Sequence, residues 1–359
     1  MDEKYRINDS RQHEAYKEIT FTGFKKNHVI NALFKSIETK KIEEACHWTT
    51  ECILSGYSDI LFEKLIIFIS KVIHINNPNL PLYILRKKKV YNNQIALLND
   101  KDKDRFILLR NSQMIRNLFF DIVTTLCTSP RTKKYDKYSK IDIVEDFKYE
   151  NMKKRLCSKM HILPDHIIRF NDADDIRIII NEIFTMCKNK QFGYDRCCFW
   201  IQWLLRWEAQ HKKKKIHWNI DYRDIKEVKE KFRCNIIWVI WEVIMEEVKI
   251  RGDENIKKQI DALYTLYTEN YTISKRNTRL PLVFHAIGYL THDINFSILI
   301  RNNMKVSIQV QCNVNKMFQL KKTHEINKAS LKKDVKKKKN IDVEIVKDKI
   351  SILNELDKF

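Results

Sequence analysis

Glycine and proline are scarce in this chain of 359 residues, which contains only five of each. Average usage would give about four to five times as many glycines. Few tight hairpin turns can form, and no G-x-x-x-x-G-K-[ST] or G-x-G-x-x-G pattern occurs, which excludes a glycine-rich phosphate loop. Long helices joined by polar connectors are therefore favoured. We expect an all-α fold and no nucleotide turnover through a P-loop.

The chain also lacks long apolar runs and C-x-x-C pairs. Its longest apolar stretches, 65–69 and 236–245, fall short of the roughly 18 residues that a membrane-spanning helix needs. This predicts a soluble protein with no membrane partner. The nine cysteines form an odd, irregularly spaced set, and no apolar signal region opens the sequence. We therefore expect reduced thiols in a cytosolic or nuclear setting.

Basic residues, by contrast, are abundant. Lys and Arg total 67 against 46 Asp and Glu, a formal net charge of +21. Such a charge attracts polyanions, of which nucleic acid is the commonest, with acidic membranes or acidic proteins behind it. Each lysine run alone is equally explained as a solvated loop, and only their sum with the net charge favours nucleic acid, DNA rather than RNA. The candidate phosphate-binding residues are Lys87, Lys88, Lys89, Lys212, Lys213, Lys214, Lys215, Lys332, Lys333, Lys336, Lys337, Lys338 and Lys339.

Composition divides the chain into two helical-bundle domains and a basic tail. Residues 1–20 are polar and predict a flexible lead-in, 21–127 predict a first helical domain, and 128–150 read as a linker with one proline. Residues 151–320 form a Trp-rich helical domain. The Lys-rich segment 321–359 is expected to be disordered with a short terminal helix, to add binding avidity, and to be removable without loss of the fold.

Apolar periodicity predicts helices at about 27–38, 59–75, 104–127 and 224–250, among others. The same pattern predicts which large side chains form the core. These are Trp48, Leu65, Phe68, Trp200, Trp203 and Trp238.

Two tryptophan blocks mark the second half of the chain. Trp200, Trp203 and Trp207 recur at i, i+3 and i+7 and are followed by Glu208. This spacing fits a stacking platform for unpaired bases next to the lysines at 212–215. It also fits helix–helix packing against Trp238 and Trp241, which precede Glu242, and packing is the favoured interpretation.

Residues 29–82 carry a resemblance to a known family. An Ala-x-x-Lys-Ser-Ile stretch, an Ala-x-x-Trp helix, a glycine stop and a late proline turn occur in that order. They resemble the C-terminal helical domain of the MgsA/RarA-type AAA+ recombination ATPases. Because the P-loop is missing, the resemblance implies a scaffold or accessory that kept the oligomerising helices without the motor, so a homo-oligomer is expected. The residues that match are Ala32, Lys35, Ser36, Ile37, Ala45, Trp48, Gly56 and Pro78, with Pro81 restarting the chain after the turn.

Taken whole, with both tryptophan blocks included, the chain is similar to an uncharacterised family that is widespread in nucleocytoplasmic large DNA viruses. This second resemblance carries no activity that could be transferred. It implies viral replication or assembly proteins as partners, and a location in the viral factory of the host cytoplasm, in the nucleus or in the virion.

Other chemistries have weaker support. His285 with His292-Asp293 invites a metal-dependent HD hydrolase interpretation, but satisfied structural histidines are favoured because the remaining ligands cannot be singled out. Cys46-His47 with Cys52, and Cys197-Cys198, lack the paired spacing of zinc sites, so inert buried thiols are favoured. The acidic run 172–175 is better explained by helix capping than by a cation. We assign no catalytic residue, metal or cofactor.

Two function classes remain open. The first is a non-enzymatic nucleic-acid-associated accessory factor in DNA replication, recombination or transcription. The second is a virion or assembly protein that neutralises DNA or docks an acidic partner. A metal-dependent hydrolase of the HD type is a distant third.

Overall fold

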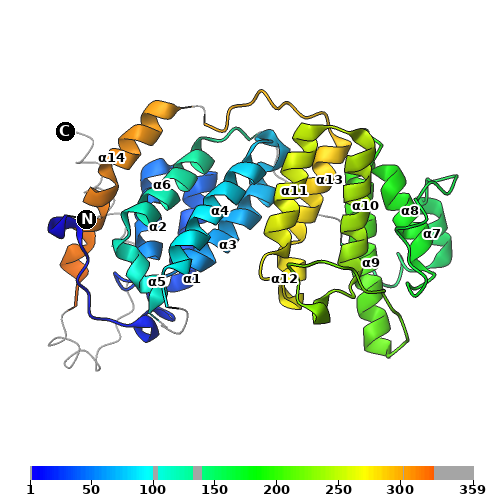
Figure 1. Cartoon of the computed structure of the whole chain (residues 1–359), viewed down its shortest axis with the longest axis horizontal. Coiled ribbons are helices and arrows are strands. Elements are labelled where there is room, and N and C mark those ends of the chain that lie inside the picture. The colour runs from blue at the N-terminus through cyan, green and yellow to red at the C-terminus, as the bar shows by residue number, and fades with distance from the viewer. Residues whose placement is uncertain (1, 100–103, 132–139, 302, 327–359) are drawn as a thin grey trace. The chain divides into compact units, whose positions relative to one another are not determined.

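The computed structural model describes residues 2–99, 104–131, 140–301 and 303–326. Over these ranges the chain forms 14 α-helices joined by loops and by short 3-10 or π turns, with no β-strand (Figure 1). The all-α prediction is therefore confirmed. The chain divides into two compact units, which are described separately below.

Unit 1 contains the described residues within Met1–Leu65, Arg86–Ser129 and Ile300–Phe359. Helix α6 lies at its centre and begins where the Ser112 side chain accepts a hydrogen bond from the Ile115 N–H. The α6 sequence is apolar on most sides, and α2 and α14 both pack on it, while α1 packs on α2. The helices of this unit are α1 (Lys26–Glu38), α2 (Ile42–Leu54), α5 (Arg105–Leu108), α6 (Gln113–Thr128) and α14 (Met304–Lys321), with most of α3 (Ser58–Phe68) and α4 (Leu80–Ala96).

The polar N-terminal segment is part of the packed unit, which corrects the prediction of a flexible lead-in at 1–20. Ile7 and Tyr16 are buried. The Asn111 side chain accepts from the Ile7 N–H at 2.9 Å and donates to the Ile7 carbonyl at 2.9 Å. Buried Asp9 accepts from the Tyr16 hydroxyl at 2.9 Å. Polar composition misleads here because the segment satisfies its polar groups within the protein instead of in water.

Unit 2 consists of Ile66–Leu85 and Pro130–Leu299. Its helix α8 shows why the sequence folds this way, because Ile176, Ile179, Ile180 and Ile183 recur at i, i+3, i+4 and i+7 and are all buried. Helix α9 packs between α8 and α13, and α11 packs on α13. The helices are α7 (Tyr149–Arg155), α8 (Ile176–Met186), α9 (Gly193–Lys214), α10 (Ile236–Arg251), α11 (Glu254–Thr268), α12 (Ile273–Thr278) and α13 (Leu280–Thr291).

Several predicted helix boundaries need correction. The helix predicted from 224 begins only at Ile236, because the Asn235 side chain accepts from the Ile237 N–H and caps it there. In the helix predicted at 59–75, the α-helical part ends at Phe68, and the chain then forms a π-helical turn over Ile69–Ile73. The helix predicted at 104–127 is interrupted by a 3-10 turn before Ser112.

The units also divide the chain differently from the predicted domains. Residues 66–85 group with unit 2, and the described residues between 300 and 326 group with unit 1. Composition along the chain cannot reveal this division, because each unit combines segments that are far apart in the sequence. The predicted core is confirmed in both units, since the six large side chains named from the sequence, Trp48, Leu65, Phe68, Trp200, Trp203 and Trp238, are all buried.

Candidate nucleic-acid interface

The C-terminal end of α9 in unit 2 concentrates exposed positive charge. Lys215 adopts the left-handed conformation that ends the helix, with φ of 55°. Lysines in a last turn also complement the helix dipole. Lys212 forms an ion pair with Glu208 at 3.2 Å. No ion pair within the described ranges involves Lys213, Lys214 or Lys215. We call residues 212–215 the α9 lysine cluster.

The exposure of all four lysines in this cluster indicates how the end of α9 lies relative to the core of unit 2. Successive helical residues point about 100° apart, so three in a row face nearly all sides of a helix. All four lysines of the cluster are exposed. The last turn of α9, at the lower end of unit 2 in Figure 1, therefore projects into solvent instead of lying flat on the core. A projecting cationic end can approach a polyanion from several directions.

The predicted tryptophan stripe divides into an inner and an outer part. Trp200 and Trp203 are buried, which confirms the packing interpretation for both. Trp207 stacks on Trp203 with ring centroids 4.8 Å apart and planes 15° apart, and it is only half-buried. His211 then contacts both Trp207 and Trp218, at 4.7 and 6.0 Å. An aromatic row thus leads from the core to the base of the α9 lysine cluster.

The second tryptophan block is structural. Trp238 packs edge-on against Tyr271 at 4.7 Å, and Trp241 packs against Tyr264 at 5.2 Å. Both indoles are buried. The glutamates that follow the blocks are ion-pair partners: Glu208 pairs with Lys212 and Arg276, and Glu242 pairs with Arg169 and Arg223.

The acidic run 172–175 holds side chains of this surface in place through hydrogen bonds and an ion pair. Its carboxylates do not cap α8 and do not form a cation site. Asp175 is the N-cap residue of α8, but its side chain makes no capping hydrogen bond and instead accepts from the indole N–H groups of Trp207 and Trp218. Asp172 is buried against Arg223 at 2.7 Å. Burial raises the pKa of Asp172, but the hydrogen bonds from Arg223 and two backbone N–H groups outweigh it and hold the pKa below its usual value.

The lysine run at 87–89 in unit 1 does not present three free cations. Lys87 forms an ion pair with Asp121 at 2.6 Å. Lys88 is buried, with its ammonium 4.9 Å from the ring centroids of both Phe62 and Tyr91. The stem of Lys88 lies on the inner face of α4, so this residue does not fit the predicted role. Lys89 is exposed. The remaining candidates, Lys332, Lys333, Lys336, Lys337, Lys338 and Lys339, lie outside the described residues.

The residues behind the family resemblance have structural roles in this fold. Ala45 and Trp48 are buried in α2, and Ser36 donates to the Ala32 carbonyl at 2.9 Å. Gly56 has φ of +73°, and a side chain there would meet Ile107 at 3.0 Å. Lys35 of the signature is exposed on α1. The Pro78 carbonyl accepts from the Tyr289 hydroxyl, and Pro81, which restarts the chain after the turn, is the second residue of α4.

His285 and the four cysteine candidates lie in cores, whereas His292 is half-buried at the end of α13. His285 is fully buried and stacks on His74 at 4.6 Å, whereas Asp293 is paired with Lys190 in a loop. Burial raises the pKa of the Cys46 and Cys52 thiols well above the usual value, which favours the protonated form. Within the described ranges, no three His, Cys, Asp or Glu side chains come together in a way that could hold a metal ion.

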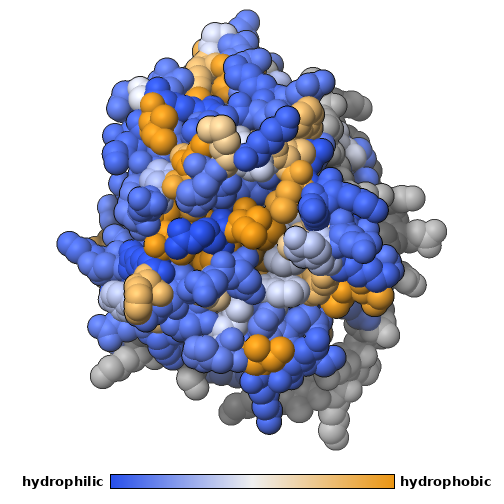
Figure 2. Space-filling model, turned by 90° about the vertical axis from the view of Figure 1, so that its right-hand side faces the viewer, coloured by the Kyte–Doolittle hydropathy of each residue, from blue (hydrophilic) through white to orange (hydrophobic). Residues whose placement is uncertain are grey.

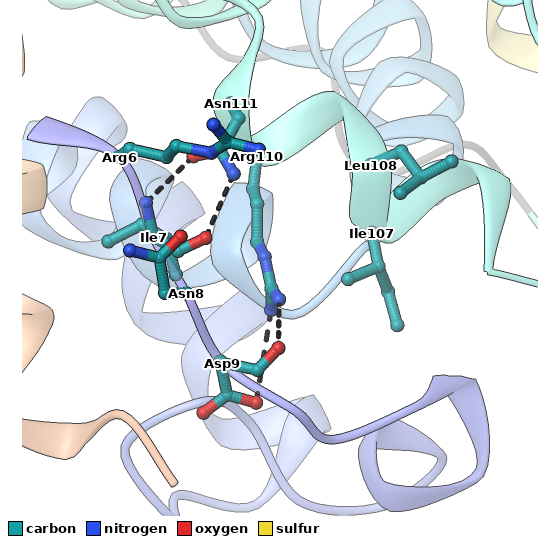
Figure 3. Close-up of a pocket in the computed structure, with 8 residues that line it drawn as sticks. All are labelled: Arg6, Ile7, Asn8, Asp9, Ile107, Leu108, Arg110 and Asn111. Atoms are coloured by element: carbon teal, nitrogen blue, oxygen red, sulfur yellow. Dashed lines mark hydrogen bonds and ion pairs between the residues drawn. The ribbon is translucent and has the colours of Figure 1, made fainter. Parts of the chain in front are cut away.

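A pocket of about 610 Å³ lies in unit 1 between residues 6–9 and 107–111 (Figure 3). Arg110 reaches across it and donates to the Asp9 carbonyl at 2.8 Å, with its other nitrogen 4.0 Å from the Asp9 carboxylate. That carboxylate is also held by Arg11 at 2.6 Å. The lining residues include no nucleophile, and their charged groups form ion pairs, Arg110 with Asp9 and Arg6 with Glu3 outside the pocket, so the pocket offers no evident chemistry. They are Arg6, Ile7, Asn8, Asp9, Ile107, Leu108, Arg110 and Asn111.

Comparisons with known proteins do not identify the chain. No family model matches it, and the searches of curated proteins and of solved structures find no similar protein. The two resemblances noted from the sequence therefore remain hypotheses. None of the helices in the described ranges has the length and apolar character that a bilayer crossing requires.

Proposed function

We propose that this protein binds nucleic acid, DNA in preference to RNA, and acts as a non-enzymatic accessory factor in replication, recombination or transcription. One observation carries the proposal: the exposed α9 lysine cluster, in which Lys213, Lys214 and Lys215 have no ion pair within the described ranges. Unneutralised lysines at a projecting helix end are the groups that displace counterions from a phosphate backbone. The net charge of +21 supplies a long-range attraction of the same sign.

The aromatic row beside the cluster supports the same proposal. Trp207, His211 and Trp218 are held at a fixed position because Asp175 binds both indole N–H groups. A cationic surface with ring systems at its base is typical of proteins that bind nucleic acid without sequence preference. Such binding depends strongly on salt, because each phosphate contact releases counterions.

The direct test is binding of the full-length protein to labelled DNA and RNA oligonucleotides of mixed sequence, followed by fluorescence anisotropy. The proposal predicts affinity at low salt that falls steeply as salt rises, with little dependence on sequence. Absence of affinity for every oligonucleotide at low salt would contradict it. A parallel assay of ATP hydrolysis by the pure protein should give no turnover above a mock purification, as expected without a P-loop.

The alternative, a virion or assembly protein that docks a partner, has one observation in its favour. Apolar side chains are exposed around α7 and α8, namely Tyr149, Met160, Ile162 and Ile178. Figure 2 shows orange apolar groups among blue polar ones on this end of unit 2. Exposed apolar groups that gather in this way mark interaction surfaces. A pull-down with nuclease treatment separates the alternatives, because a partner held through this surface would survive nuclease and one held through nucleic acid would not.

A further inference from the structure

Phe170 is a large apolar side chain that the fold leaves in water. It lies in the loop between α7 and α8 of unit 2 and is 99% exposed. Burying a phenylalanine ring is worth roughly 1.5–3 kcal/mol, so an entirely exposed ring forgoes that stabilisation. Isolated exposed apolar residues are common. Phe170 differs from such residues because hydrogen bonds and ion pairs hold the loop that carries it.

The loop is held rigidly on both sides of the ring. The backbone N–H of Arg169 donates to Asp172 at 2.8 Å, and the buried Arg223 binds the same carboxylate at 2.7 Å. The Arg169 guanidinium in turn binds Glu242 at 3.0 Å. Phe170 is thus displayed on a preformed loop, and a ligand that covers it incurs little ordering cost.

A second aromatic segment runs beside this loop. The Ala173 N–H donates to the Asn219 carbonyl at 2.9 Å, and the Asn219 side chain donates to the Asn171 carbonyl at 3.1 Å. Trp218 is therefore next to the Phe170 loop, and its contact with His211 joins it to the last turn of α9. A chain of contacts thus links the Phe170 loop, through the half-buried Trp218 indole and His211, to the helix turn that carries the α9 lysine cluster.

We propose that this surface takes the unpaired bases of single-stranded nucleic acid, with Phe170 as a stacking platform and Lys213 to Lys215 holding the backbone. The inference rests on the function proposed above and names its substrate class. Every base has a π-face, so a ring displayed in this way stacks without sequence preference. In a duplex those faces are already stacked on neighbouring bases. Duplex therefore engages the lysines alone.

The charges around the rings fit this orientation. Asp175 accepts from the Trp218 indole, Asp221 accepts from Asn171 next to Phe170, and Asp172 is neutralised by Arg223. Carboxylates repel phosphates, so the backbone follows the lysines while the bases face the rings. A protein partner anchored by Phe170 is the competing occupant. It would not explain why the Phe170 loop is linked through Trp218 and His211 to the turn that carries the exposed lysines.

The test compares the full-length protein with Phe170→Ala and Phe170→Trp on three labelled ligands. These are a single strand of about 16 nucleotides, the upper site size of stacking folds, a blunt-ended duplex of two annealed strands, and an abasic strand of equal length. Phe170→Ala should weaken single-strand binding by about five- to 150-fold, the range for loss of one stacked base. Phe170→Trp should restore it, whereas duplex and abasic binding should be unchanged. Because no phosphate contact is lost, the salt dependence should keep its slope.

Phe192→Ala is the matched control, because this ring is 41% exposed at the other end of α9, roughly 33 Å along a helix of 22 residues. It should bind every ligand as the wild type does. The inference is overturned if Phe170→Ala binds single strands like the wild type, or loses equal affinity for the abasic strand. In either case the wild-type protein still binds and the proposed function stands. If the wild-type protein binds none of the three ligands, the proposed function fails as well, and a protein partner becomes the occupant to seek.

Discussion

Lys321, the last residue of α14, donates from Nζ to Glu51 of α2 across 3.1 Å, and both side chains are buried in unit 1. The same ammonium lies 3.3 Å from Nε2 of His47. Burial raises the pKa of Glu51, but the Lys321 charge and hydrogen bonds from Thr20 and Thr22 outweigh it and lower the pKa to about 2. The carboxylate is therefore ionised and paired inside the protein.

Breaking this pair should destabilise the fold. Lys321→Met leaves the Glu51 carboxylate buried without its counter-charge, which typically costs about 3–5 kcal/mol of unfolding free energy. The double variant Glu51→Gln with Lys321→Met removes both charges and should recover most of the loss. Urea unfolding followed by tryptophan fluorescence measures both. A single variant as stable as the wild type would show that the pair is not formed.

The pair also predicts a pH dependence. The pKa of Glu51 is lowered in the folded state, so its stabilisation is present above the unfolded value of 4.5 and is lost as pH falls toward about 2. Unfolding curves between pH 5 and pH 2.5 should show a shallower decline for the double variant than for the wild type. Parallel declines would contradict the assignment.

His285 in unit 2 predicts a second, higher pH window. Burial lowers the pKa of this histidine from 6.5 to about 3, so the folded state holds it neutral while the unfolded chain protonates it. The unfolded state binds more protons below pH 6.5, and stability should fall by up to about 1.4 kcal/mol per pH unit from this one site. His285→Phe should remove that slope between pH 6 and pH 4. Equal slopes in the two proteins would count against a neutral buried imidazole.

Two glycines in unit 2 form a matched pair of packing tests. A side chain at Gly288 would come within 2.4 Å of a ring atom of His74, a contact that real structures do not tolerate. Gly252 ends α10 with φ of +66° and open space around it. Gly288→Ala should therefore lower the free energy of unfolding by at least the roughly 1–3 kcal/mol that overpacking typically costs. Gly252→Ala should cost only the left-handed strain of about 1–2 kcal/mol.

Thermal unfolding of the two glycine variants checks this contrast. The packing account predicts a clearly lower melting temperature for Gly288→Ala than for Gly252→Ala. The reverse order would show that His74 does not occupy the space beside α13.

The C-terminal segment gives a test of where the folded unit ends. Removal of 321–359 was expected from composition to spare the fold, but Lys321 is buried, and the Ile326 N–H donates to Asp9 at 2.9 Å. Deleting 321–359 should therefore destabilise unit 1, whereas deleting 327–359 should not. Both deletions remove the six lysines between 332 and 339, so both should weaken DNA binding. Equal stability of the two truncated proteins would contradict the role of Lys321.

The fold class and much of the core could be predicted from sequence, because both follow from spacing within one segment. The isoleucines at 176, 179, 180 and 183 repeat at helical intervals, and their burial needs no knowledge of the partner helix. The roles of Lys88 and Lys321 could not be predicted. A lysine next to other lysines has the composition of a surface, and only tertiary contacts with Phe62 or Glu51 bury it.

The candidate site was predicted only in part. The exposed lysines at 212–215 were expected, and Trp207 was recognised as part of a stripe. Phe170 and Trp218 were missed, because each is a single aromatic residue in a polar loop. Their arrangement depends on hydrogen bonds between segments about 50 residues apart, such as Ala173 to Asn219. A lone aromatic flanked by Arg and Asn, as in Arg169-Phe170-Asn171, was the one available signal.

The central claim is that the α9 lysine cluster contacts phosphates. The most direct test compares Lys213→Gln/Lys214→Gln with Lys257→Gln/Lys258→Gln, two exposed neighbouring lysines on α11, of which Lys257 is ion-paired with Glu254 at 3.7 Å. Both double variants carry the same net charge. DNA binding is measured across a range of salt concentrations. We predict that the α9 variant reduces the steepness of the slope of log binding constant against log salt by about 1.4–1.8, which corresponds to the loss of two phosphate contacts. The α11 variant should leave this slope unchanged. Equal slopes for the two variants would contradict the account.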